Sequence, residues 1–295
     1  MGSPEFAIPS LEALIERYNV VGVVTQPDKP AGRGKELKAP PVKRVAEKHQ
    51  IEVVQPVRLR EPGAFDLIKQ WDPDVIVVVA FGQILRQGVL DLPRFGCVNV
   101  HGSLLPRWRG AAPIQAAILH GDPESGITIM KMGAGIDTGP ILSQETLKIQ
   151  DDDTTESLGT SLSVLGAKLL LETLPGYIGG KLKPIPQLEV GATYAPMLKK
   201  ENGLLDFSKS AIDLDRQVRA FYPWPGTFIV INKERIKVIK TSVIENPKMS
   251  PNERGIINGC PVVGTSNGNL KLDLVQPAGK KIMAGKIFLN GFRGW

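Results

Sequence analysis

Cysteine is scarce in this chain, and its two copies form no recognisable site. Cys97 and Cys260 stand far apart among 295 residues, and neither belongs to a CxxC pair or a histidine-rich cluster. A disulfide framework or a zinc site needs several such residues at short spacing. We therefore expect no disulfide and no metal ion, and we interpret both thiols as small buried hydrophobes.

Long apolar runs are also missing. The longest, "VIVVVAF" at 75–81, is far shorter than the ~20 residues that a membrane-spanning helix needs. The N-terminus lacks the basic segment and apolar run of a signal peptide. We therefore expect a cytoplasmic protein with no membrane partner.

The common phosphate-binding and nucleophile motifs are absent as well. The sequence contains no GxGxxG or GxxxxGK[ST] loop and no GxSxG elbow, and "GRGKEL" at 32–37 matches a phosphate-binding loop only loosely. Chemistry driven by a nucleotide is therefore not indicated.

Acidic residues are in deficit, and the deficit is uneven. Residues 195–295 hold 16 Lys and Arg against 8 Asp and Glu, and residues 29–60 hold nine basic side chains against three acidic ones. Two separated basic regions suit an extended polyanion, because each neutralised phosphate releases counterions. A solvated lysine-rich surface explains the same charges equally well.

Short β-branched runs alternate with amphipathic stretches in the first half of the chain. We expect strands within 19–26, 73–82, 95–101 and 126–132, and helices within 40–51, 63–71 and 111–121. This alternation predicts an α/β domain with a doubly wound, mostly parallel sheet, which binds ligands at the carboxyl ends of its strands.

The last third has a different pattern. A proline-rich stretch at 181–196 follows a leucine-rich helix and predicts an extended linker. A helix capped by Ser208 or Ser210 comes next, and then strands in which Leu270, Leu272 and Leu274 alternate with polar residues. We expect a small antiparallel β-barrel or sandwich, with domains at 1–181 and 199–295 joined by a linker at 182–198.

The stretch "NVHGSLLPRWRG" at 99–110 contains one of only three histidines. Side chains two apart in a strand point the same way, so Asn99 and His101 project from one face near the end of a strand. An amide and an imidazole suit the stabilisation of an oxyanion that forms on a carbonyl group. A capped strand edge is the alternative. We interpret His49 and His120 as structural.

Asp137 lies among three glycines in "MGAGIDTGP" at 132–140. A carboxylate on such a loop can keep His101 protonated or position a water molecule. An Asx-turn is the competing interpretation.

Four segments resemble the methionyl-tRNA formyltransferase family: "TQPDKPAGRGKEL", "NVHGSLLPRWRGAAPIQ", "GIDTGPIL" and "FYPWPGTF". The resemblance covers nearly the whole chain. It implies a formyltransferase, Rossmann-like fold followed by an OB-like barrel. It also implies 10-formyltetrahydrofolate as the formyl donor and initiator methionyl-tRNA as the acceptor.

The resemblance assigns roles by position. Asn99 and His101 would stabilise the tetrahedral oxyanion, and Asp137 would act on His101 and help to relay the amine proton. Ser103, Leu104, Leu105 and Pro106 would contact the folate, with Ile84 and Leu85 near its pterin.

The family also supplies expectations for RNA binding. Arg33 and Lys35 would reach the acceptor stem, and the C-terminal barrel would follow the tRNA backbone. Arg107 and Arg109 either position the substrate or surround a core Trp108. We expect a monomer.

Two departures from the family pattern concern the ends. The first strand that precedes "GSPEFA" in the family is absent, so the natural protein begins upstream of Met1 or this chain has lost that strand. The family's C-terminal tail runs a little past "FRGW". A formyltransferase for glycinamide ribonucleotide or for a sugar-nucleotide amine is an alternative, as is a non-catalytic tRNA-binding protein.

Overall fold

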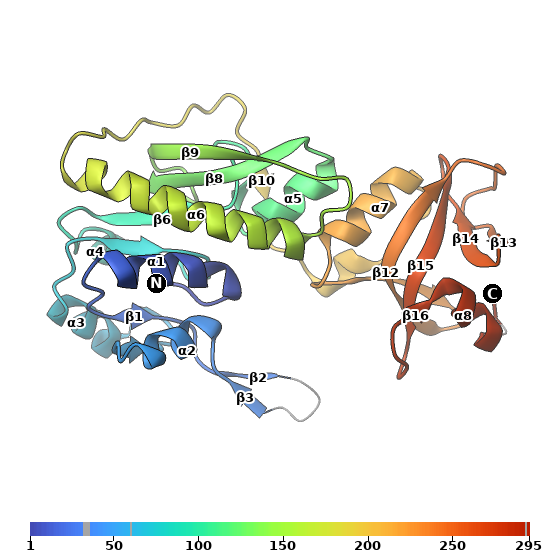
Figure 1. The fold of residues 1–295 in the computed structure, drawn as a ribbon, viewed down its shortest axis with the longest axis horizontal. Helices are drawn as coiled ribbons and strands as arrows, with labels where there is room; N and C mark the ends of the chain where they lie inside the picture. Colours follow the sequence, from blue (N-terminus) through green and yellow to red (C-terminus); the bar gives the residue numbers. More distant parts are fainter. Residues whose placement is uncertain (32–35, 60, 293) are drawn as a thin grey trace. The chain divides into compact units, whose positions relative to one another are not determined.

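The computed structural model describes residues 1–31, 36–59, 61–292 and 294–295, which divide into two compact units (Figure 1). The N-terminal unit comprises Met1–Pro113, Glu124–Lys148 and Gly159–Ala195. The C-terminal unit comprises Ile114–Pro123, Ile149–Leu158 and Pro196–Trp295.

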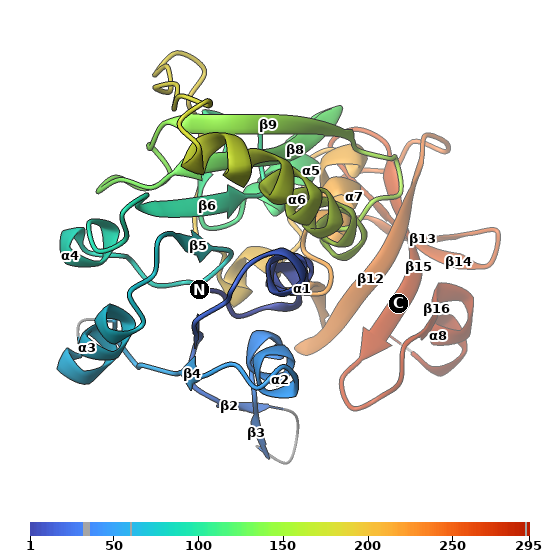
Figure 2. The same ribbon diagram turned by 60° about the vertical axis from the view of Figure 1, so that its left-hand side comes forward.

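The N-terminal unit is built on a sheet that is parallel in one part and antiparallel in the other (Figure 2). Its strands are β1 (Val23–Val24), β4 (Val53–Val54), β5 (Ile76–Val78), β6 (Cys97–His101), β8 (Glu124–Lys131) and β9 (Ile141–Lys148). β1 pairs with β4 and β5 with β6 in parallel, whereas β8 runs antiparallel to both β6 and β9. The four strand regions expected from the sequence are confirmed, but β8 and β9 form an antiparallel hairpin.

Residues 1–3 take the sheet position between β1 and β5. Gly2 N donates a hydrogen bond to Val24 O at 3.1 Å, and Val79 N donates to Met1 O at 2.9 Å. These bonds connect the β1–β4 pair to β5 through the start of the chain.

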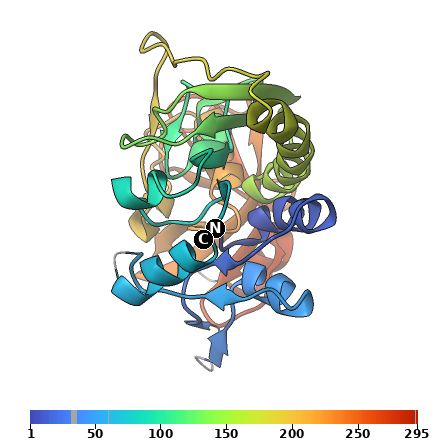
Figure 3. The ribbon, with the colours of Figure 1, turned by 90° about the vertical axis from the view of Figure 1, so that its left-hand side faces the viewer.

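Helices cover both faces of this sheet (Figure 3). On one side lie α1 (Ile8–Arg17), α2 (Pro41–Lys48) and α6 (Thr155–Ile178), and on the other lie α3 (Pro62–Gln70) and α4 (Gln87–Leu90). The core holds the β-branched side chains of the strands, which are apolar on both faces because both are covered. The doubly wound arrangement expected from the sequence is confirmed.

The stretch at 182–195 is extended and bonded to the N-terminal unit. Ile185 and Ile141 exchange backbone hydrogen bonds of 2.8 and 2.7 Å. Further along, β10 (Tyr194–Ala195) pairs in parallel with β7 (Arg109–Gly110). The segment expected as an extended linker is therefore extended, and it is hydrogen-bonded to the N-terminal unit.

The C-terminal unit contains an antiparallel sheet in the order β11-β12-β15-β14-β13, with β16 paired to β15. The elements are β11 (Thr227–Ile231), β12 (Glu234–Ile244), β13 (Arg254–Ile257), β14 (Cys260–Gly264), β15 (Asn269–Pro277), β16 (Met283–Ala284), and the helices α7 (Ala211–Ala220) and α8 (Gly285–Gly291). Ser210 caps α7, because its Oγ accepts from Asp213 N at 3.2 Å. In the part of the chain that is described, β11 and β13 are not paired, so the strands form a sheet and not a closed barrel.

The alternation expected in β15 is correct at its start and wrong at its end. Leu270 and Leu272 are fully buried, but Leu274 is only half-buried and Val275 takes the inward position. The pairing of β12 with β15 shifts register on either side of Lys240. An irregularity of this kind reverses which residues face the core.

No helix in the described ranges combines the length and apolar character needed to cross a membrane.

Candidate active site

Strand β6 carries the two polar side chains at the centre of the site. All five of its residues are buried, with Asn99 8% and His101 6% exposed. Val100 faces α6, where a Cβ on Gly166 would approach its side chain to 2.8 Å. Cys97 contacts α4 on the other side through Val89 O. Because Asn99 and His101 share the parity of Cys97, the predicted common face of the pair is confirmed.

Asp137 comes to this pair from the loop between β8 and β9. Its Oδ1 accepts a hydrogen bond from Asn99 Nδ2 at 3.4 Å, and its Oδ2 lies 3.7 Å from His101 Nδ1. Oδ2 also accepts from Gly110 N at 2.8 Å. The carboxylate thus binds groups from other segments, as the functional interpretation requires and an Asx-turn does not.

The opposite ring nitrogen of His101 has a different partner. Nε2 lies 3.0 Å from the carbonyl oxygen of Trp108. A carbonyl oxygen only accepts, so Nε2 must carry a hydrogen in any tautomer that keeps this bond. Nδ1, which faces Asp137, is therefore the nitrogen that can gain or lose a proton.

The backbone at Trp108 is unusual for a non-glycine residue, with φ at +61°. Gly110 follows with φ at +115°, and a Cβ there would lie 2.6 Å from Ala195 O. Trp108 is 6% exposed, with the guanidinium of Arg107 4.4 Å from its ring centroid. This tight turn presents the Trp108 carbonyl to His101 and the Gly110 amide to Asp137.

The predicted folate-binding loop follows β6 and is fastened by its own polar groups. Ser103 Oγ donates to Arg107 O at 2.6 Å, which leaves only its lone pairs for a ligand. Thr128 Oγ1 donates to Ser103 O at 2.6 Å and accepts from Leu105 N at 3.0 Å. Gln144 Nε2 donates to Leu105 O at 2.9 Å. Leu105 is buried, whereas Leu104 and Pro106 are half-buried.

The residues predicted to contact the pterin and the tRNA lie outside the loop that follows β6. Ile84 is 79% exposed in the loop after β5, whereas Leu85 is 5% exposed and packs in the core. Arg33 and Lys35 lie outside the described residues. The stem on either side of them is the hairpin of β2 (Lys29–Ala31) and β3 (Glu36–Lys38).

The base of that hairpin carries a fixed acidic group. Asp28 accepts hydrogen bonds from Gln55 Nε2 at 2.6 Å and from Lys43 Nζ at 2.9 Å. The bond from Gln55, followed by that from Lys43, lowers the pKa of Asp28 below its ordinary value. The chain entering the basic loop is thereby anchored to α2.

Two residues next to the site, Gln187 and Glu189, gave no clear signal in the sequence, and both accept hydrogen bonds from Arg109. Arg109 is 1% exposed, and its guanidinium binds both carboxylate oxygens of Glu189 at 3.1 Å. It also donates from Nε to Gln187 Oε1 at 3.0 Å. Arg109 is therefore neither at a rim nor open to substrate, and the hydrogen bonds that its guanidinium donates to Glu189 raise its pKa above the ordinary value.

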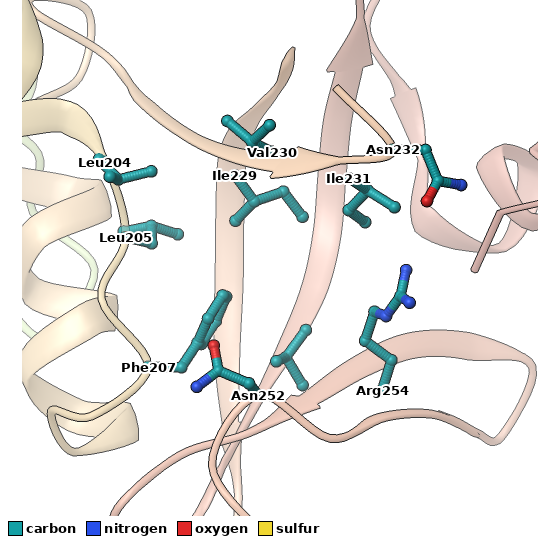
Figure 4. Close-up of a pocket in the computed structure, with 10 residues that line it drawn as sticks. Leu204, Leu205, Phe207, Ile229, Val230, Ile231, Asn232, Asn252 and Arg254 are labelled. Carbon is teal, nitrogen blue, oxygen red and sulfur yellow. The ribbon is translucent and has the colours of Figure 1, made fainter. Parts of the chain in front are cut away.

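A separate cavity of about 350 Å³ lies in the C-terminal unit (Figure 4). Its lining combines apolar residues, such as Phe207 and Ile229, with the polar side chains of Asn232, Asn252 and Arg254. It contains none of the residues predicted for catalysis or folate binding.

Comparison with known proteins matches both halves of the chain. A family model described as "Formyl transferase" matches residues 4–174, and one described as "Formyl transferase, C-terminal domain" matches residues 197–293. The methionyl-tRNA formyltransferase of Myxococcus xanthus is 46% identical over 298 residues, covering 99% of this chain and 94% of that protein. That of Geobacter sulfurreducens is 44% identical over 300 residues, covering 99% and 93%.

Solved structures show the same fold at lower identity. A sugar 3N-formyl transferase, crystallised in the presence of dTDP and 5-N-formyl-THF, matches with a TM-score of 0.69 at 20% identity, covering 95% of this chain and 97% of that one. The N-formyltransferase from Helicobacter canadensis, in complex with folinic acid and dTDP-3-aminofucose, also matches with a TM-score of 0.69 at 20% identity, covering 94% and 97%.

Proposed function

Because the chain belongs to the formyl transferase family, we propose that it transfers the formyl group of 10-formyltetrahydrofolate to the α-amino group of methionine on initiator tRNA. The observation that carries this proposal is the near full-length similarity to methionyl-tRNA formyltransferases at 43–46% identity. The solved sugar formyltransferases are far less similar, at 20% identity. The tRNA acceptor is therefore favoured over a sugar-nucleotide amine.

Asn99 and His101 stabilise the charge that develops in the reaction. Attack of the amine nitrogen on the formyl carbon forms a C–N bond and places a negative charge on the formyl oxygen. Asn99 has a second amide hydrogen besides the one directed at Asp137, and that hydrogen can face the oxyanion. His101, in its protonated form, adds a positive charge at the same strand edge.

Asp137 and His101 handle the proton. The amine attacks in its neutral form; once bonded to the formyl carbon, its nitrogen must lose one proton, and N10 of the folate must gain one when its bond to the formyl carbon breaks. His101 Nδ1 faces the Asp137 carboxylate at 3.7 Å, and Asp137 stabilises the imidazolium while the proton is held there. The products are formylmethionyl-tRNA and tetrahydrofolate, with no net change in protons on the enzyme.

The loop of Ser103, Leu104, Leu105 and Pro106 holds the folate, with Ile84 and Leu85 near its pterin. Thr128 and Gln144 support this proposal, because they fix the loop backbone before a ligand arrives. The folate domain spans residues 1–181.

The C-terminal domain, residues 199–295 after a connection at 182–198, is an OB-like module that binds the tRNA backbone. Its 16 basic against 8 acidic residues (195–295) support this role. Arg235, Lys237 and Lys240 are exposed on β12. Arg33 and Lys35 form the second contact, at the acceptor stem. The enzyme acts as a monomer in the cytoplasm.

The test is formyl transfer from 10-formyltetrahydrofolate to charged initiator tRNA, with glycinamide ribonucleotide and a dTDP-linked amino sugar as parallel acceptors. We expect transfer to the tRNA alone, abolished by His101→Ala. Transfer to another acceptor in preference to tRNA would replace the proposed substrate. Tight tRNA binding without transfer to any acceptor would leave a non-catalytic binding protein.

A further inference from the structure

The loop between β8 and β9 carries Asp137 and is called the catalytic loop below. It is held by a glutamine that the proposed mechanism does not use. Gln187 belongs to the extended segment at 182–195, and its Nε2 donates hydrogen bonds to Asp137 O at 2.8 Å and to Gly139 O at 2.7 Å. Both hydrogens of the amide are therefore used on the loop that presents the Asp137 carboxylate.

Arg109 sets the direction of this amide. Its Nε donates to Gln187 Oε1 at 3.0 Å, and a guanidinium can only donate. The oxygen of Gln187 must therefore face Arg109, and its nitrogen must face the loop. Glutamate at position 187 would offer no donor to the two carbonyl groups, and asparagine would be one methylene shorter.

The loop needs such a support because its backbone is unfavourable by itself. Asp137 has φ at +49°, in the left-handed region that non-glycine residues rarely adopt. A Cβ on Gly139 would overlap the carbonyl oxygen of Lys131. The bonds from Gln187 fasten the backbone on both sides of this turn.

The same hydrogen-bond network also positions Gly110, the residue whose backbone amide binds the Asp137 carboxylate. Arg109 is followed directly by Gly110, whose N donates to Asp137 Oδ2 at 2.8 Å. Arg109 and Gly110 form β7, which pairs with β10 of the extended segment. Arg109, Gly110 and Gln187 thus form one hydrogen-bonded group that holds both the backbone and the carboxylate of Asp137.

We propose that Gln187, oriented by Arg109, is a positioning residue that sets the distance between the Asp137 carboxylate and His101. This inference rests on the proposed function, because it assigns Gln187 a role in the same formyl transfer. Gln187 touches no reacting atom. Its effect on the reaction passes through the position of Asp137.

The experiment compares Gln187→Met with a matched control, Gln217→Met. Methionine has a similar length and makes no comparable hydrogen bonds. Gln217 lies in α7 of the C-terminal unit and also donates from Nε2 to two backbone carbonyls, of Asn202 at 2.8 Å and of Leu204 at 3.3 Å. Each substitution removes the same kind of bond, but only one of the two glutamines supports the catalytic loop.

We expect Gln187→Met to lower kcat by about 10- to 100-fold with KM for both substrates within about twofold, since small displacements of a catalytic group have effects of this size. Gln217→Met should leave kcat unchanged. Hydrogen exchange of the Gly110 amide should become at least about 10-fold faster in Gln187→Met alone, because its acceptor is released.

Asp137→Asn separates the failure of this inference from failure of the proposed function. In that background Gln187→Met should lower kcat by less than about threefold more, because its route of action is already lost. A full 10- to 100-fold further loss would overturn the positioning role. So would normal kcat in Gln187→Met while Asp137→Asn is inactive. Normal kcat in Asp137→Asn would instead contradict the proposed site itself.

Discussion

Asn99→Ala tests the central assignment of the site. The substitution removes the amide that lies 8% exposed at the edge of β6, while the backbone pairing of β6 with β5 and β8 stays. Loss of one oxyanion donor typically lowers the rate by about 10²- to 10³-fold, or roughly 3–4 kcal/mol of transition-state stabilisation. We expect a loss of that size in kcat.

The effect on folding should be much smaller. The bond from Asn99 to Asp137 is long at 3.4 Å, and Asp137 keeps its 2.8 Å bond from Gly110 N. Removing it should lower the free energy of unfolding by about 1 kcal/mol. The variant should therefore remain folded and should bind tRNA with normal affinity.

The assay is a single-turnover measurement of formyl transfer with both substrates saturating, accompanied by tRNA binding and urea unfolding. Asn99→Asp is the companion variant, since a carboxylate there can only accept and would repel the oxyanion; it should be at least as slow. A rate for Asn99→Ala within about threefold of the original protein would refute the oxyanion role. Weak tRNA binding with a normal transfer rate would refute it as well.

Three further predictions concern other parts of the chain. Burial raises the pKa of the Cys97 thiol to about 12, so a thiol reagent at pH 8 should modify Cys260 first and Cys97 only on unfolding; prompt modification of both would contradict this. Gly110→Ala combines a φ of +115° with a Cβ 2.6 Å from Ala195 O and should lower the free energy of unfolding by about 1–3 kcal/mol or more, which urea titration would measure; unchanged stability would argue against the turn described. Arg33→Ala should weaken tRNA binding and reduce the slope of log K against log salt by about 0.7–0.9, and an unchanged slope would remove this loop from the interface.

The sequence predicted those features of the site that depend on local order along the chain. The parity of a strand places Asn99 and His101 on one face, and the glycines around Asp137 mark a loop with unusual backbone. The alternation of strands and helices predicted the doubly wound sheet for the same reason: the apolar pattern of each element states which of its faces is buried.

The antiparallel hairpin of β8 and β9 and the inward turn of Val275 were not predictable in this way. Strand direction depends on how a connection crosses the sheet, and the phase of β15 changes at a register shift against β12. Both are properties of the pairing between strands, and the same strand sequence is compatible with either direction or phase. The sequence of one strand therefore does not reveal them.

Only the tertiary structure decided what supports the catalytic loop. Gln187 follows a proline in a segment without periodicity, and Arg109 resembles a surface residue in the sequence. Folding buries Arg109 and brings the two together across 78 residues. A hydrogen-bonded amide needs partners in three dimensions, and the identities of such distant partners leave no pattern in neighbouring residues. The sequence by itself therefore determined which groups we propose for the chemistry, and the tertiary structure decided which groups surround and contact them.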